Sequence, residues 1–220
     1  MKLRLFQHIL ILFVFNSCIV LSIHPFYTKE SIYFEKKLIG NWEDQSYNEW
    51  KIIPFKEYYL RKQKQENLSA DSIKFLKKYI HAYLITYQDE KNQEIEFVGM
   101  PFKIDNNLFI DFYLSSCDCE IDELASMHLA PLHSLAKVEL LNKNSLNLVW
   151  LGDEKFKHHI DENKIKIKYE KIGLKNDQYI LSDDSENLEK FIKRYMNSAI
   201  PNKWESGEEQ VEIHLTKKDG

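Results

Sequence analysis

The residues best suited to chemistry include two cysteines, Cys117 and Cys119, which are separated by one residue. A disulfide across so short a loop is strained, because the bridge requires a specific Cα separation and dihedral geometry. A tetrahedral metal site would need further ligands. We therefore expect a structural role for this pair, and a redox or metal-binding role remains the alternative.

Histidine pairs are a second feature with metal-binding chemistry. His158 and His159 are adjacent, and His128 and His133 are five residues apart. In an extended chain both spacings place the two side chains on opposite faces. Neither pair is arranged to bind one ion from a regular strand, so we expect no metal site and no cofactor.

Asp111 stands between two aromatic residues, Phe109 and Tyr113, on one face of a predicted strand. If that face is buried, the carboxylate needs hydrogen bonds or a charged partner, and such groups concentrate at functional sites. If the face is exposed, Asp111 is an ordinary surface residue. No nucleophile and base can be paired from spacing alone. We assign no catalytic residue, and we expect a non-enzymatic role while leaving enzyme activity open.

The elements that must position these residues are mostly β-strands, because apolar and polar residues alternate along much of the chain. Predicted strands cover residues 49–55, 79–87, 94–104, 108–114, 128–140, 145–151, 164–170 and 178–182, and residues 58–60 continue the extended chain after Pro54. So many short strands predict a mainly β fold, either an antiparallel barrel or a curled meander of eight or nine strands.

Helical periodicity is clearest near the end of the chain. Leu188, Phe191, Ile192 and Tyr195 fall at i, i+3, i+4 and i+7, and the acidic stretch 183–186 can cap the helix N-terminus. We expect this α-helix to pack on the barrel or sheet.

Two other segments are less regular. A short helix within residues 63–78 would begin at Ser69 or Asp71. Residues 201–220 form a polar tail that contains one short apolar alternation, which indicates an added edge strand or a disordered end.

The chain begins with two basic residues, Lys2 and Arg4, followed by an apolar stretch from Ile9 to Phe15. This order is typical of a secretory signal. Ser17 and Cys18 resemble a bacterial lipobox, in which the cysteine is acylated and becomes the mature N-terminus. An uncleaved anchor fits less well, because the apolar stretch is shorter than the roughly 20 residues that a span needs. Secretion without lipid is the third interpretation.

These features divide the chain into a signal peptide at 1–17, a lipid-anchored segment at 18–37, a β domain at 38–200 and a polar tail at 201–220. The net charge is −4, and removal of residues 1–17 with their two positive charges would leave −6. Basic residues are dispersed among acidic ones, which is typical of a solvated surface. We expect no nucleic-acid partner, and an extracytoplasmic location at a bacterial membrane.

Four short stretches resemble one protein family. They are Ile23–Glu30, Leu38–Trp42, His128–Ser134 and Leu188–Tyr195. They are similar to a group of small, largely uncharacterised bacterial lipoproteins with a lipocalin-like domain. The resemblance implies a lipocalin-like barrel with the C-terminal helix packed on it.

In lipocalins a Gly-x-Trp motif opens the first strand and its Trp closes one end of the barrel, so the resemblance assigns these roles to Gly40 and Trp42. Lipocalins also stack an Arg from a late strand on this Trp. No Arg occurs between Arg61 and Arg194. The stacking is therefore absent here, or another group provides it.

The chain is rich in aromatic residues, with 13 Phe, 12 Tyr and 4 Trp. In a small barrel such residues either fill the interior or line a ligand cavity. The candidates for a cavity wall with polar groups are Tyr79, Tyr83, Tyr87 and Asp111. We expect an envelope lipoprotein that binds a small apolar or amphipathic ligand. The alternative is a filled barrel that acts as a non-enzymatic interaction or assembly module.

Overall fold

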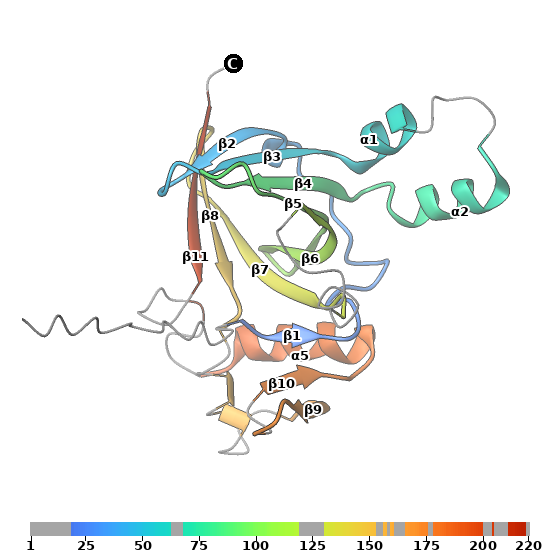
Figure 1. The fold of residues 1–220 in the computed structure, drawn as a ribbon. Coiled ribbons are helices and arrows are strands. Elements are labelled where there is room, and N and C mark those ends of the chain that lie inside the picture. The colour runs from blue at the N-terminus through green and yellow to red at the C-terminus, as the bar shows by residue number, and fades with distance from the viewer. Residues whose placement is uncertain are drawn as a thin grey trace, which may run out of the picture.

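Eight antiparallel strands close into a barrel in the computed structural model of this protein (Figure 1). The structure describes residues 19–62, 68–118, 130–152, 156, 157, 159, 160, 166–175, 178–199, 204 and 211–218. The barrel strands are β2 (Gly40–Asp44), β3 (Glu49–Pro54), β4 (Tyr83–Gln88), β5 (Glu94–Ile104), β6 (Asn107–Asp118), β7 (His133–Leu140), β8 (Ser145–Trp150) and β11 (Glu212–Lys217). They pair in chain order, and β11 joins β8 to β2. The predicted mainly β barrel is confirmed.

The alternation of side chains along β7 shows why the ring closes around an apolar interior. Ala136, Val138 and Leu140 pack in the interior cluster, whereas His133, Lys137 and Glu139 point to the other face, as predicted. Successive residues of a strand point to opposite faces, so this pattern fixes which side is buried. β8 pairs back on β7 as the predicted hairpin.

The polar tail contributes β11, which is not an edge strand. Ile213 pairs with Leu148 of β8, and Leu215 pairs with Asp44 of β2, so both edges of β11 are hydrogen-bonded. The alternation around Leu215 identified a strand correctly. Its position was predicted wrongly, because its partners lie far away in the sequence and local pattern does not reveal them.

Three further strands extend the sheet beside the barrel. β1 (Leu21–Ser22) pairs antiparallel with β7 and parallel with β10 (Gln178–Leu181), and β10 pairs with β9 (Tyr169–Ile172). The strand predicted at 178–182 is confirmed. Of the strand predicted at 164–170, residues 164 and 165 lie outside the described residues, and β9 begins at Tyr169; just before it, the Lys168 carbonyl oxygen accepts the backbone N–H of Ser182 at 3.0 Å.

Helix α5 (Ser185–Asn197) covers the outer face of the barrel (Figure 1). The Asp184 carboxylate accepts the backbone N–H of Asn187 at 2.9 Å and caps the helix N-terminus. Leu188, Phe191, Ile192 and Tyr195 are buried against outward-facing residues of β5, β6 and β7, as the periodicity predicted. This apolar cluster lies outside the barrel, and a second one fills its interior, so apolar side chains pack against both faces of β6.

Two helices, α1 (Phe55–Lys62) and α2 (Ala70–Lys78), lie between β3 and β4. Ser69 caps α2 as one of the two predicted positions. The extended chain predicted at 58–60 is wrong, because α1 begins directly after Pro54. The strand predicted at 79–87 begins only at Tyr83, because Tyr79 is the residue that ends α2. Within the described ranges, no helix is long and apolar enough to cross a bilayer.

Candidate functional site

Gly40 and Trp42, the residues predicted to lie at a barrel end, belong to β2, the first strand of the barrel. Trp42 is 1% exposed, and its indole Nε1 donates to the carbonyl oxygen of Leu38 at 2.9 Å, in the 3-10 helix η1 (Lys36–Leu38). Lys217 of β11 places Nζ 5.2 Å from the Trp42 ring centroid, within the range of a cation–π contact. The cation beside the Trp42 ring is therefore a lysine.

Gly40 is needed for this contact. A Cβ at this position would lie 2.8 Å from Cε of Lys217, so a larger residue would push the lysine stem off the ring. The backbone φ of 148° at Gly40 is also one that residues with a side chain rarely adopt. Nothing in the local sequence could have identified Lys217 as the partner, since 175 positions separate it from Trp42.

Asp44 lies on the same face of β2 as Trp42, at the hairpin that leads to β3. Its Oδ1 accepts the backbone N–H of Ser46 at 2.8 Å and of Asn48 at 3.0 Å. Its Oδ2 accepts Asn48 Nδ2 and Trp50 Nε1, both at 3.0 Å. Burial by itself would raise the pKa of Asp44, but the hydrogen bonds, led by that from Trp50, hold it below its ordinary value.

Tyr83 and Tyr87 both face the barrel interior from β4, as predicted. The Tyr83 hydroxyl donates to the carbonyl oxygen of Glu35 and accepts its backbone N–H, each at 2.8 Å, so this group holds the segment before η1. The Tyr87 ring meets Trp50 edge-on at 5.0 Å. Burial, followed by the nearby Asp44 and Asp89 charges, raises the pKa of Tyr87.

Asp44, Trp50 and Tyr87 thus form one group, which we call the Asp44 cluster. It combines an anionic acceptor, an indole donor and a phenol hydroxyl in an otherwise apolar interior. Tyr79 does not join it. Its ring packs outside the barrel against Phe55 at 5.8 Å and Phe75 at 4.9 Å.

Asp111 lies on the outer face of β6, where it is buried rather than exposed. Its Oδ1 lies 2.6 Å from Nδ1 of His133, and its Oδ2 accepts the backbone N–H of Phe26 at 2.8 Å. Burial raises the pKa of Asp111, and the contacts with His133 and Phe26 offset only part of that effect. The ring of Tyr113 covers His133, with centroids 5.0 Å apart.

This pair fastens the segment before β2 to the barrel wall. Phe26 is fully buried, and the Thr28 N–H and the Ser31 hydroxyl both donate to Oε2 of Glu189 in α5, each at 2.7 Å. Ser22 lies opposite His133 across the β1–β7 pairing, and its hydroxyl donates to the carbonyl oxygen of Leu181 at 3.3 Å and accepts the backbone N–H of His24 at 3.2 Å. The Asp111–His133 pair therefore supports an anchoring role for Asp111 more directly than a role in a ligand cavity.

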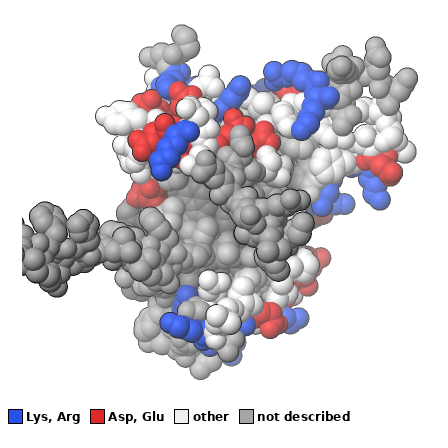
Figure 2. Space-filling view, viewed as in Figure 1, with Lys and Arg blue, Asp and Glu red and all other residues white. Residues whose placement is uncertain are grey.

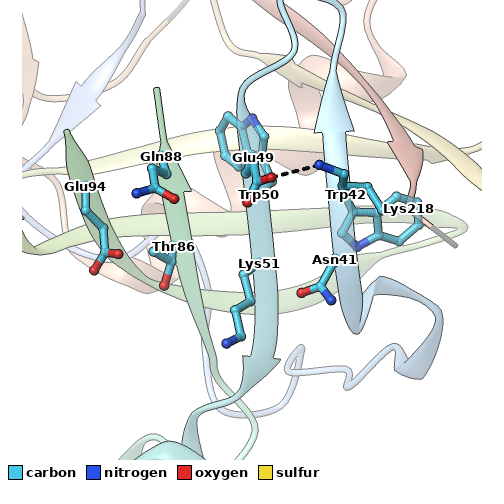
Figure 3. Close-up of a pocket in the computed structure, with 9 residues that line it drawn as sticks. All are labelled: Asn41, Trp42, Glu49, Trp50, Lys51, Thr86, Gln88, Glu94 and Lys218. Atoms are coloured by element: carbon cyan, nitrogen blue, oxygen red, sulfur yellow. Dashed lines mark hydrogen bonds and ion pairs between the residues drawn. The ribbon is translucent and has the colours of Figure 1, made fainter. Parts of the chain in front are cut away.

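A polar cleft of about 500 Å³ lies on the outer surface of β2 to β5 (Figure 3). Asn41, Lys51 and Thr86 are successive cross-strand partners, and Glu94 comes from β5. Lys218 holds one side through ion pairs with Glu49 at 2.8 Å and Glu43 at 3.2 Å. The cleft is thus lined by both acidic and basic side chains. Sequence reasoning missed it because its members come from four strands and the end of β11.

Several predicted residues lie outside what the structure describes. Cys18, Cys119, His128 and His158 are among the residues not described, and nothing is described of the Cys117 side chain. Within the described ranges, no three His, Cys, Asp or Glu side chains are grouped so that they could hold a metal ion.

Comparison with known proteins gives no relative: no family model matches the chain, and neither does any curated protein or solved structure.

Proposed function

We propose that this chain is an extracytoplasmic, lipid-anchored protein that binds a small amphipathic molecule inside its barrel. The Asp44 cluster carries the proposal. It sets three polar groups on an interior wall that is otherwise built from residues such as Ile85, Phe97 and Phe112. Binding sites of this kind are mainly apolar, with a few polar groups that orient the ligand.

Each member of the cluster has a defined part in this proposal. The four donors that Asp44 already accepts keep it ionised and fixed in place. The Tyr87 hydroxyl makes no hydrogen bond within the described residues, so it is the group that remains able to bind a polar head. The edge-on rings of Phe97 and Phe112, 5.7 Å apart, offer an apolar surface for the rest of the ligand.

The proposal is tested by mass spectrometry of small molecules that co-purify with the folded protein, followed by titration with a panel of fatty acids. Trp50 contacts Tyr87, so its fluorescence should change as a ligand binds. Tyr87→Phe removes only the hydroxyl and should weaken binding by about 1 kcal/mol, or roughly fivefold. Tyr47→Phe is the matched control, because Tyr47 is 81% exposed. Folded protein that yields no small molecule and no fluorescence response would contradict the proposal.

The lipid anchor has a separate test. Cells that express the chain are grown with a radioactive fatty acid, and the protein is compared with Cys18→Ala. Label on the unaltered chain and none on the variant is the expected result. If the unaltered chain takes up no label, the anchor is disproved while ligand binding in the barrel remains untouched.

A further inference from the structure

Helices α1 and α2 project sideways from the barrel (Figure 1). No residue of α2 is buried, although the helix is clearly amphipathic. Ile73, Phe75 and the following Ile80 are 42%, 43% and 38% exposed. Large apolar side chains that are exposed together mark a surface that binds something.

One of these exposed side chains, Phe75, is held in place by a cluster of aromatic rings. Phe75 packs on Tyr59 with centroids 5.5 Å apart and on Phe55 at 6.0 Å, and Tyr79 packs on both Phe75 and Phe55. Phe55 itself is buried and closes this cluster on the barrel wall. α2 is therefore docked on α1 through one side of Phe75, while its other apolar residues still face outward.

Charge is concentrated on the same two helices. From Phe55 to Ile80 there are seven Lys and Arg residues against three Asp and Glu residues, a net charge of +4. The whole chain carries −4, so the remaining residues together carry −8. The basic residues within the described part are Lys56, Arg61, Lys62, Lys74, Lys77 and Lys78. Figure 2 shows Lys and Arg side chains over this projecting part of the molecule.

Tyrosines accompany these cations. Lys62 Nζ lies 5.4 Å from the ring centroid of Tyr58, and Lys78 Nζ lies 5.0 Å from that of Tyr79. Tyr and Lys side chains favour the water–lipid boundary because each has an apolar body and a polar end. A short helix with Phe and Ile on one side and lysines on the other is typical of helices that lie on a membrane surface.

We propose that α1 and α2 dock on an anionic lipid bilayer, with Ile73, Phe75 and Ile80 entering the headgroup region and the lysines meeting lipid phosphates. The charge distribution favours this partner. A negative surface attracts the +4 segment and repels the rest of the chain, which orients the protein before contact. The proposal does not depend on the barrel ligand or on acylation of Cys18.

The test is flotation of the full chain carrying Cys18→Ala with lipid vesicles, so that no acyl chain contributes. We expect binding to vesicles that contain phosphatidylglycerol, little binding to phosphatidylcholine alone, and weakening as salt rises. The apolar residues 1–17 are common to all variants, so differences between variants report on the helices.

Two variants address the two parts of the proposal. Lys74→Glu with Lys77→Glu should lower binding to the anionic vesicles by at least about tenfold. Ile73→Ser with Ile80→Ser should lower it by a similar factor without changing the salt dependence. All four residues are exposed, so both variants should keep the melting temperature and circular dichroism of the parent.

The matched control is Lys36→Glu with Lys37→Glu, an equal charge change at two exposed positions on η1. It should float nearly as the parent does. If the α2 variants bind as the parent does, or if the control loses binding equally, the bilayer is not the partner of these helices. Failure of the parent to float with phosphatidylglycerol vesicles would also overturn the lipid assignment.

Discussion

Two buried carboxylates on one barrel have pKa shifts of opposite sign. Asp44 is held below its ordinary value, whereas Asp111 is held above it. Burial raises the pKa of both groups, and it acts more strongly on Asp111, which is 1% exposed against 9% for Asp44. The number of donors also differs: Asp44 accepts four N–H groups, while Asp111 accepts one from Phe26 and contacts one ring nitrogen of His133.

The two sites also differ in where their donors come from. Those of Asp44 lie within six residues of it, in the β2–β3 hairpin. Those of Asp111 are 22 and 85 residues away. A hairpin can supply a full set of donors to its own carboxylate, whereas a long-range site depends on separate elements arriving together. The Asp111 site therefore forms only after residues far apart in the sequence have packed together.

The same substitution at both sites should have unequal effects. In Asp44→Asn, the amide NH2 group would face N–H donors that now bind the carboxylate. The substitution should lower the free energy of unfolding by about 3 kcal/mol, because several donors lose a charged acceptor. Asp111→Asn still offers an oxygen to Phe26 and removes a charge that burial disfavours, so it should cost no more than about 1 kcal/mol. Urea denaturation at neutral pH measures both. Equal costs would refute the donor-count explanation.

The pH dependence should sharpen the contrast, because the two groups act in opposite directions. The lowered pKa of Asp44 contributes stability that is present above the ordinary value of 3.8 and is lost as pH falls through the folded pKa. The raised pKa of Asp111 contributes stability that is present below 3.8 and is lost as pH rises through the folded pKa.

The expected measurement follows from these signs. The stability advantage of the parent over Asp44→Asn should shrink on acidification, while its advantage over Asp111→Asn should grow. Thermal unfolding of the three proteins from neutral pH to about pH 3 tests this, and parallel curves would contradict it.

His133→Phe keeps a ring beside Tyr113 but removes the contact with Asp111. We expect a loss of about 1 to 2 kcal/mol, because one buried acceptor loses its nearest partner. The backbone N–H of Phe26 should exchange with solvent faster, since its carboxylate acceptor is less firmly held. Lys137→Met, on the same face of β7, is the control. Unchanged exchange at Phe26 would show that Phe26 does not depend on this pair.

The smallest expected effect is at the other end of β2. Lys217→Met keeps the apolar stem over Gly40 but removes the charge near Trp42, and should cost about 0.5 to 1 kcal/mol. Tryptophan fluorescence and urea denaturation measure it. A cost as large as that of Asp44→Asn would mean that the cation, and not the hydrogen-bonded carboxylate, is the more important polar group on β2.

Local pattern was enough to predict some elements. β7 alternates strictly and α5 has both its apolar spacing and its cap, so each signal specifies one structure. Local sequence pattern failed where an apolar segment is short and aromatic. Residues 58–60 fit a strand or a helix equally well, and packing of Phe55 on Tyr59 selects the helix. The partners of Asp111 depend on chain reversals that no short window of sequence contains.

The position of β11 sets the order in which the barrel can form. Seven of the eight described barrel strands are synthesised before residue 212, yet the edges of β2 and β8 have no partner until residues 212–217 are available. Unpaired edges are templates for aggregation, and pairing across most of the chain is slow. A growing chain of this protein therefore leaves the edges of β2 and β8 open to other chains until residues 212–217 have been made.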